Sequence, residues 1–220
     1  MGEDNNNLDR GNFIVFEGID GSGKSTQVKL LANRLRALGL QYFETREPTD
    51  GPIGSLIRQF LTGRIETDDR VMASLFAADR LDHLLNGRDG IAEKINSGVS
   101  VISDRYYLSS YAYHGVSLPI EWVIEANSVS AGILRPTCNI FIDLDPETAL
   151  ERIKKYRSHT ELYEVLDRLT EVRNKYFEAI GLVKGAETIV IVDGSLDETA
   201  LSDLIWEKLS PRFFKPENQL

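Results

Sequence analysis

The chain of 220 residues carries 25 basic and 34 acidic side chains, a formal net charge of −9 at pH 7, and 42% of its residues are apolar. This composition is typical of globular proteins and excludes a collagen, a long coiled coil or a wholly disordered chain. A chain this acidic is poorly suited to non-specific binding of nucleic acid or of a membrane surface, so we expect neither partner. Any phosphate that it binds must meet a local cluster of positive groups.

The first ten residues are polar and predict a disordered leader, followed by a single domain over residues 11–220. The leader lacks the apolar centre of a signal peptide, and no apolar run is long enough to span a bilayer. The single cysteine, Cys138, has no partner for a disulfide within the chain, which suits a reducing compartment. We therefore expect a cytoplasmic protein.

Short apolar runs alternate with helical patterns along the chain. Helices are predicted from the apolar repeat between Val28 and Leu38, from the capping sequence Asp145-Pro146-Glu147, and over residues 161–182. Strands are predicted at residues 13–16, 42–45, 99–102, 139–142 and 188–192. Most of these runs are continuously apolar, as parallel strands covered on both faces are. The alternation predicts an α/β fold whose ligands bind beyond the carboxyl ends of the strands.

Directly after the first strand comes Gly18-Ile-Asp-Gly-Ser-Gly23-Lys24-Ser25, which matches G-x-x-x-x-G-K-[ST] between a strand and a helix. In such a loop, backbone N–H groups and the helix N-terminus converge on phosphate oxygens. Lys24 would supply a movable charge for the β- and γ-phosphates, and the Ser25 hydroxyl would ligate Mg²⁺. The alternative is a glycine-rich turn without catalytic meaning. The pattern predicts a nucleoside triphosphate with Mg²⁺ but does not name the phosphoryl acceptor.

Asp20 lies inside this loop, where its carboxylate would repel a phosphate unless a cation or a hydroxyl group offsets it. The alternative is a residue that faces solvent. A partner for Asp20 is therefore expected if the loop binds phosphate.

Two arginines lie where strands should end, Arg46 in Thr45-Arg46-Glu47-Pro48 and Arg105 in Asp104-Arg105-Tyr106. A guanidinium group binds phosphate oxygens bidentately, so the two would hold an acceptor that is itself a phosphate. Each could instead form a surface ion pair. Asp104 would face Mg²⁺, directly or through water, or would hold Arg105 in place.

Phe76 and Arg80 are four residues apart and share one face of a predicted helix. This pair would suit a flat heterocycle, with stacking from the ring and hydrogen bonds from the guanidinium. The alternative is a core phenylalanine beside an arginine that extends to water.

In their order and spacing, the motifs of residues 12–205 resemble those of thymidylate kinases, and their form is similar to archaeal and bacterial members. The motifs are Phe16-Glu-Gly-Ile-Asp-Gly-Ser-Gly-Lys-Ser-Thr26, Thr45-Arg-Glu-Pro48, Phe76-Ala-Ala-Asp-Arg80 and Asp104-Arg-Tyr106 with Ser109-Ser-Tyr-Ala-Tyr113. The resemblance implies a P-loop NTPase fold with a five-stranded parallel sheet, helices on both faces and a short lid. It also implies a homodimer that transfers the γ-phosphoryl group of ATP to dTMP with Mg²⁺.

The resemblance also implies a role for single residues at the acceptor. Phe76 would stack on thymine, Arg80 would bind its carbonyl group, and Ser110 with Ser109 would meet the base edge. Tyr113 would crowd the 2′ side of the sugar, Arg46 and Arg105 would hold the phosphate, and Asp20 would meet the sugar hydroxyl or an arginine. The family often has Gln where this chain has His114.

The resemblance also implies that ATP contacts the loop motif through Gly18, Asp20, Gly21, Ser22, Gly23, Lys24, Ser25 and Thr26. Some members carry arginine where this chain has Gly21, so a lid over residues 152–164 must supply the charge. Arg157 is the first candidate, with Arg152 nearby. Tyr163 and Glu164 match an aromatic–Glu pair near the nucleotide, and Ser195 would border adenine. Lys24, Asp20, Arg105 and Arg157 would form the catalytic set.

Three other functions are alternatives to this one. A kinase of another pyrimidine nucleotide or deoxynucleoside, such as UMP or dUMP, would share most of this chemistry. A GTP-binding switch usually carries [NT]-K-x-D, whereas Asn174-Lys175 is followed here by Tyr and Phe. A non-catalytic paralogue is disfavoured because the loop and the arginines are intact.

Overall fold

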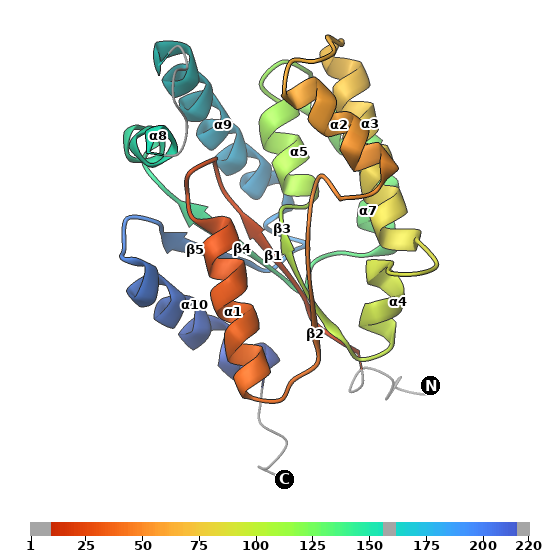
Figure 1. Cartoon of the computed structure of the whole chain (residues 1–220), viewed down its shortest axis with the longest axis vertical. Helices are drawn as coiled ribbons and strands as arrows, with labels where there is room; N and C mark the ends of the chain where they lie inside the picture. Colours follow the sequence, from red (N-terminus) through yellow and green to blue (C-terminus); the bar gives the residue numbers. More distant parts are fainter. Residues whose placement is uncertain (1–9, 156–161, 215–220) are drawn as a thin grey trace.

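A parallel sheet forms the centre of the molecule (Figure 1). The computed structural model describes residues 10–155 and 162–214, with only the backbone at 162–164. The strands are β1 (Phe13–Glu17), β2 (Tyr42–Arg46), β3 (Ser100–Asp104), β4 (Cys138–Asp143) and β5 (Ile189–Asp193). They lie in the order β2-β3-β1-β4-β5, and every neighbouring pair is parallel. The predicted five-stranded parallel sheet is therefore confirmed.

Helices cover both faces of the sheet (Figure 1). They are α1 (Lys24–Ala37), α2 (Pro52–Leu61), α3 (Asp69–Leu85), α4 (Ile91–Asn96), α5 (Tyr107–His114), α6 (Ile120–Ala126), α7 (Ser128–Ile133), α8 (Pro146–Lys154), α9 (Leu162–Val183) and α10 (Glu198–Phe213). Asp145 caps α8 by accepting from the N–H groups of Glu147 and Thr148, both at 3.1 Å, as its sequence predicts. The predicted helix over residues 161–182 is α9.

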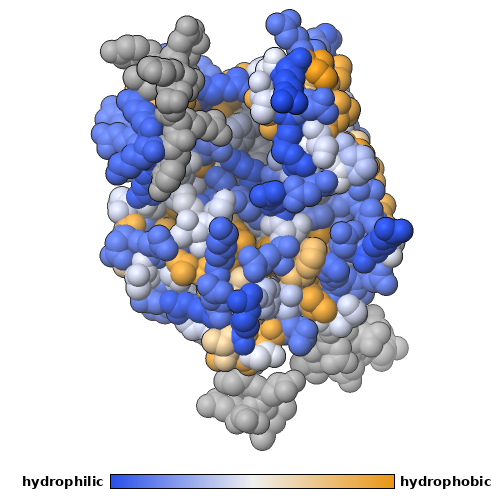
Figure 2. Space-filling view, in the orientation of Figure 1, coloured by the Kyte–Doolittle hydropathy of each residue, from blue (hydrophilic) through white to orange (hydrophobic). Residues whose placement is uncertain are grey.

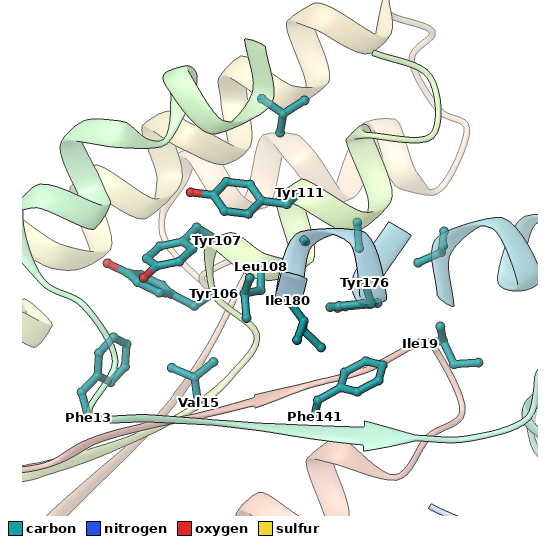
Figure 3. Packing of buried hydrophobic residues seen from close by; sticks show 14 of the residues in the cluster. Phe13, Val15, Ile19, Tyr106, Tyr107, Leu108, Tyr111, Phe141, Tyr176 and Ile180 are labelled. Atoms are coloured by element: carbon teal, nitrogen blue, oxygen red, sulfur yellow. The ribbon is translucent and has the colours of Figure 1, made fainter. Parts of the chain in front are cut away.

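Alternate residues of β1 build two separate cores, because successive side chains of a strand point to opposite faces. Ile14 and Phe16 pack with α1 and α10. Phe13 and Val15 pack on the other face against α4, α5 and α9, where Tyr106, Phe141 and Tyr176 add aromatic rings (Figure 3). Burial of each of these isoleucine, valine and phenylalanine side chains stabilises the fold by about 1.5–3 kcal/mol.

The two edge strands are less buried than the three central ones, since each has a neighbour on one side only. β1 is buried throughout, whereas β2 and β5 consist mainly of half-buried and exposed residues, and Ile191 in β5 is 47% exposed. The expectation of strands covered on both faces therefore holds for the centre of the sheet. On the molecular face seen in Figure 2, hydrophobic residues are scattered among hydrophilic ones, as on ordinary protein surfaces.

The carboxyl ends of β1, β2 and β3 meet at one edge of the sheet. Asp104 pairs in register with Phe16 on one side and with Arg46 on the other. The β1–α1 loop, Arg46 and Arg105 consequently gather at this edge, as the strand-end positions predict. These features are those of a P-loop NTPase α/β fold.

Some predictions concern residues outside those described. They are the leader, apart from Arg10, and the middle of the predicted lid, residues 156–161. Among the residues with described structure, none of the helices combines the length and the apolar character needed to cross a membrane.

Candidate active site

The β1–α1 loop requires glycine at two of its turns. Gly21 has φ +80°, and a Cβ atom there would lie 2.6 Å from the carbonyl oxygen of Ala149. A Cβ atom on Gly18, where φ is +147°, would lie 2.7 Å from the carbonyl oxygen of Ile142. Within the part of the chain that the structure describes, no side chain caps α1, and its first turn contains no acidic residue. The N–H groups at this helix end are thus available to an anion.

Lys24 is folded back into the loop that precedes it. Its ammonium group donates to the carbonyl oxygens of Gly18 at 3.0 Å and Ile19 at 2.8 Å, and the residue is only 6% exposed. Burial and, to a smaller extent, the nearby charge of Arg105 lower the pKa of Lys24 to about 8, against the opposite effect of Asp20 and Asp104. A bound phosphate chain would restore the preference for the charged form.

We therefore expect Lys24 to take up a proton when ATP binds at alkaline pH. Because the pKa of Lys24 in the free protein is about 8, binding at pH 8.5 should take up more than about half a proton per ATP, against roughly a tenth at pH 7. Isothermal titration calorimetry in two buffers of different ionisation enthalpy measures this uptake. A Lys24→Ala variant is the control. Equal uptake at pH 8.5 in that variant would show that another group takes the proton.

Arg105 and Asp20 face each other across the loop. The Arg105 guanidinium donates to Asp20 Oδ1 at 2.6 Å and to the Tyr113 hydroxyl at 3.2 Å, and the backbone N–H of Asp20 donates to that same hydroxyl at 3.1 Å. The predicted cationic partner of Asp20 is thus Arg105, which does not form its ion pair with Asp104. Arg105 also stacks over the ring of Tyr113, 4.8 Å from its centre.

Asp104 instead contacts the first turn of α1. Ser25 Oγ donates to Asp104 Oδ2 at 2.5 Å, which joins the two predicted Mg²⁺ ligands. A hydroxyl and a carboxylate oxygen are ligands that Mg²⁺ accepts when substrate phosphates complete its shell. Among the described residues, no group of three or more His, Cys, Asp or Glu side chains could hold a metal ion alone. The donor set therefore fits an ion that arrives with a nucleotide.

One cavity of about 1010 Å³ collects most of the predicted groups. Its walls include the loop, Arg105 and Tyr113, together with Arg152 from the end of α8. An adjacent cavity of about 750 Å³ shares Ser25 and Asp104 with it and is lined by Arg46. Arg46 is 64% exposed and binds Asp50 at 2.9 and 3.1 Å, so the structure does not place its guanidinium beside Arg105.

Arg80 does not extend to water but is enclosed, 1% exposed, in a polar network. It donates to Glu47 Oε2 at 2.9 and 2.6 Å, to Ser110 Oγ at 3.1 Å and to Asn127 Oδ1. His83 contacts the other oxygen of Glu47 at 3.1 Å. Sequence patterns reveal Arg80 but not its partners, because these residues come from segments far apart in the chain.

Phe76 is half-buried, and its ring lies 5.1 Å from the ring of His114. Burial and, to a smaller extent, the charge of Arg80 lower the pKa of His114 to about 4, so the imidazole is neutral at pH 7. Phe76 thus has an aromatic neighbour on α5, the helix that also carries Ser110 and Tyr113.

The predicted lid is described only at its two ends. Arg152 donates to the carbonyl oxygen of Gly194 at 3.0 Å, next to Ser195, so the structure brings these two predicted ATP contacts together. The backbone N–H of Ser195 itself donates to Asp193 at 2.9 Å. Arg157 lies outside the described residues, and only the backbone of Tyr163 is described.

Two residues of the site have no predicted role, although Glu17 lies within the first motif. Glu17 is fully buried at the end of β1, and Tyr176 is fully buried on α9. Burial raises the pKa of Glu17 to about 7, although its hydrogen bonds and the charge of Arg105 counteract this effect. A charged residue at the end of the apolar run Phe13–Phe16 is a sequence signal that could have singled out Glu17 within its motif.

Comparison with known proteins agrees with this geometry. The sequence model of the family described as thymidylate kinase matches residues 16–205. A protein of Methanocaldococcus jannaschii named "Probable thymidylate kinase" is 40% identical over 166 residues, which cover 76% of this chain and 80% of the relative. The "Thymidylate kinase" of Leptospira borgpetersenii is 37% identical over 165 residues, 74% of this chain and 78% of the relative. The chain therefore belongs to the thymidylate kinase family.

Proposed function

We propose that this protein transfers the γ-phosphoryl group of ATP to dTMP and releases ADP and dTDP. An oxygen of the acceptor phosphate bonds to the γ-phosphorus while the bond from that phosphorus to the β–γ bridging oxygen breaks. One observation carries the proposal: the phosphate loop with Lys24 and the guanidinium of Arg105 line the same cavity. Such a site can accommodate two phosphorylated ligands and neutralise the charge between them.

The donor side uses the loop and its lysine. Backbone N–H groups of residues 21–26 would bind the phosphates of ATP, and Lys24 would leave its carbonyl partners for the β- and γ-phosphates. Ser25 and Asp104 are the residues that would hold Mg²⁺. When bound with ATP, this ion would neutralise part of the phosphate charge. Arg152 and Ser195 would border the nucleotide, and Arg157 would add charge from the lid.

The acceptor side uses residues of α3, α5 and the strand ends. Arg105 and Arg46 would bind the phosphate of dTMP, with Arg46 exchanging Asp50 for the ligand. Phe76 would stack on thymine, and Arg80 would bind its carbonyl group beside Ser110. The remaining proposed contacts are Asp20, Ser109, Tyr113 and Tyr163.

A substrate panel tests the proposal most directly. With ATP as donor, we expect kcat/KM for dTMP to exceed that for dUMP about 10- to 200-fold, the effect of one methyl group in an apolar pocket. UMP should be weaker still, because Tyr113 would crowd its 2′-hydroxyl group. The measurement is coupled ADP release, with each product identified by chromatography. Preference for UMP or a deoxynucleoside would replace dTMP as the acceptor, and no product with any of these acceptors would favour the non-catalytic paralogue.

Two further properties are proposals, of which the first rests on the family resemblance and the second on the residues. We expect a homodimer, which light scattering coupled to size-exclusion chromatography would detect as twice the chain mass. We also expect a cytoplasmic location, since Cys138 is a free, buried thiol.

A further inference from the structure

Glu17 places a carboxylate inside the apolar layer between the sheet and α5. Its Oε1 accepts from the backbone N–H groups of Tyr106 at 2.9 Å and Ser109 at 3.3 Å. Its Oε2 accepts from the hydroxyls of Ser109 at 2.5 Å and Tyr176 at 2.9 Å. The carboxylate, which is fully buried, thus joins β1 to α5 and to α9.

The same two hydroxyl groups contact Arg105. Its Nη1 donates to Ser109 Oγ at 3.1 Å and lies 3.4 Å from the Tyr176 hydroxyl, while those hydroxyls lie 2.7 Å from each other. The other nitrogen, Nη2, binds Asp20 and the Tyr113 hydroxyl. One side of the guanidinium is therefore held by the buried hydroxyl pair, and the other reaches the loop that binds ATP.

Glu17 also holds the backbone from which Arg105 extends. Arg105 has φ +79°, a left-handed conformation that is rare for residues other than glycine. Its own N–H donates to the carbonyl oxygen of Phe16 at 2.9 Å, and the next N–H, of Tyr106, donates to Glu17. Adjacent residues of β1 therefore anchor this turn where it leaves β3.

Packing alone does not require the Tyr176 hydroxyl. Its ring packs against Phe141, with ring centres 5.0 Å apart (Figure 3), and a phenylalanine would keep that contact. The hydroxyl itself touches only Glu17, Ser109 and Arg105 among its described hydrogen-bond partners. These contacts indicate that the buried Tyr176 hydroxyl orients the guanidinium of Arg105.

We propose that Glu17 and Tyr176 are positioning residues for Arg105: acting through Ser109 and the turn, they hold its guanidinium where the acceptor phosphate binds. This inference rests on the proposed function, in which Arg105 binds the phosphate of dTMP. Neither residue touches a substrate. Their effect is to fix the guanidinium before the ligand arrives, which spares the ligand the cost of ordering it.

Tyr176→Phe is the main test. We expect kcat/KM for dTMP to fall on the order of tenfold to a hundredfold, because the guanidinium loses one side of its support. KM for ATP should change less than about twofold. Glu17→Gln, which keeps the shape of the side chain, should likewise lower kcat/KM for dTMP and leave KM for ATP almost unchanged. If Glu17→Gln fails to fold, Tyr176→Phe decides alone.

Tyr107→Phe is the matched control. Tyr107 lies on the same layer, is equally buried, and donates its hydroxyl to a carboxylate, that of Glu187, at 2.5 Å. The melting temperature of the Tyr107→Phe variant should fall about as much as that of Tyr176→Phe. Its kcat/KM for dTMP should stay within about twofold of the wild type. An equal kinetic loss in Tyr107→Phe would show a general effect of core disruption and would overturn the inference.

Variants in an Arg105→Ala background separate this inference from the proposed function. Arg105→Ala alone should lower kcat/KM for dTMP at least tenfold, and adding Tyr176→Phe should then lower it no further, since coupled residues are not additive. Wild-type kinetics in Arg105→Ala would refute the phosphate-binding role and with it the proposed site. Two results would overturn only the positioning role while Arg105→Ala still lowers kcat/KM for dTMP. In one, Tyr176→Phe and Glu17→Gln keep the wild-type kcat/KM; in the other, the losses from Tyr176→Phe and Arg105→Ala add up in the double variant.

Discussion

Replacing Lys24 by alanine should lower kcat about a hundredfold to a thousandfold, which corresponds to about 3–4 kcal/mol of transition-state stabilisation. In the described structure the ammonium group binds the carbonyl oxygens of Gly18 and Ile19, 3.0 and 2.8 Å away. In the proposed reaction, the ammonium group leaves these carbonyl oxygens for the β- and γ-phosphates, where its charge would act on the transferred phosphoryl group. Loss of the charge should therefore slow the chemical step more than it weakens binding.

The fold of Lys24→Ala should be retained. Burial lowers the pKa of Lys24 to about 8, so the charged group is costly to bury and its removal relieves that cost. Lys208→Ala on the exposed face of α10 is the control and should have wild-type kinetics. The measurements are kcat with both substrates saturating and the melting temperature. A variant with near-normal kcat and a native melting temperature would remove Lys24 from the catalytic set.

Replacing Arg80 by alanine should lower the free energy of unfolding by about 3–5 kcal/mol, because it leaves the Glu47 carboxylate buried without its charged partner. The two side chains are 1% and 2% exposed, and Arg80 makes both hydrogen bonds to Glu47 Oε2. A domain of this size is stable by only about 5–15 kcal/mol, so the loss should be plain in urea unfolding. KM for dTMP should rise more than KM for ATP.

Arg70→Ala provides the control on the same helix. Its ion pair with Asp68 is exposed to solvent, 72% and 49%, so its loss should leave the urea midpoint unchanged. Adding Glu47→Ala to Arg80→Ala should recover part of the stability, since the unpaired carboxylate is then absent. A loss below about 1 kcal/mol in Arg80→Ala would mean that water or His83 compensates the charge. Equal rises in both KM values would argue against recognition of the base.

Much of the fold follows from local patterns. The apolar runs predicted all five strands to within one or two residues, and the Asp145-Pro146 capping sequence predicted the start of α8. The loop pattern predicted the conformation after β1, because a chain with glycine at positions 18, 21 and 23 can form such turns. These properties depend on neighbours in the chain, so the sequence displays them directly.

Partners of the charged groups were harder to predict. The motifs singled out Asp20, Arg46, Arg80 and Arg105, and for each a surface or ligand-free alternative remained open. Asp20 pairs with a residue 85 positions away, and Arg80 pairs with one 33 positions away. The choice between Asp20 and Asp104 as partner of Arg105 depends on the left-handed turn after β3, which no local motif indicates.

Taken alone, the amino-acid order established the α/β class, the phosphate loop and the resemblance to one kinase family, since each is a matter of residue type and spacing. Only the folded chain decided that Arg105 faces Asp20, that Arg80 is enclosed, and that Glu17 and Tyr176 meet beneath Arg105. The reason is that hydrogen bonds act over about 3 Å. Such contacts form only after β1, α5 and α9 have packed together.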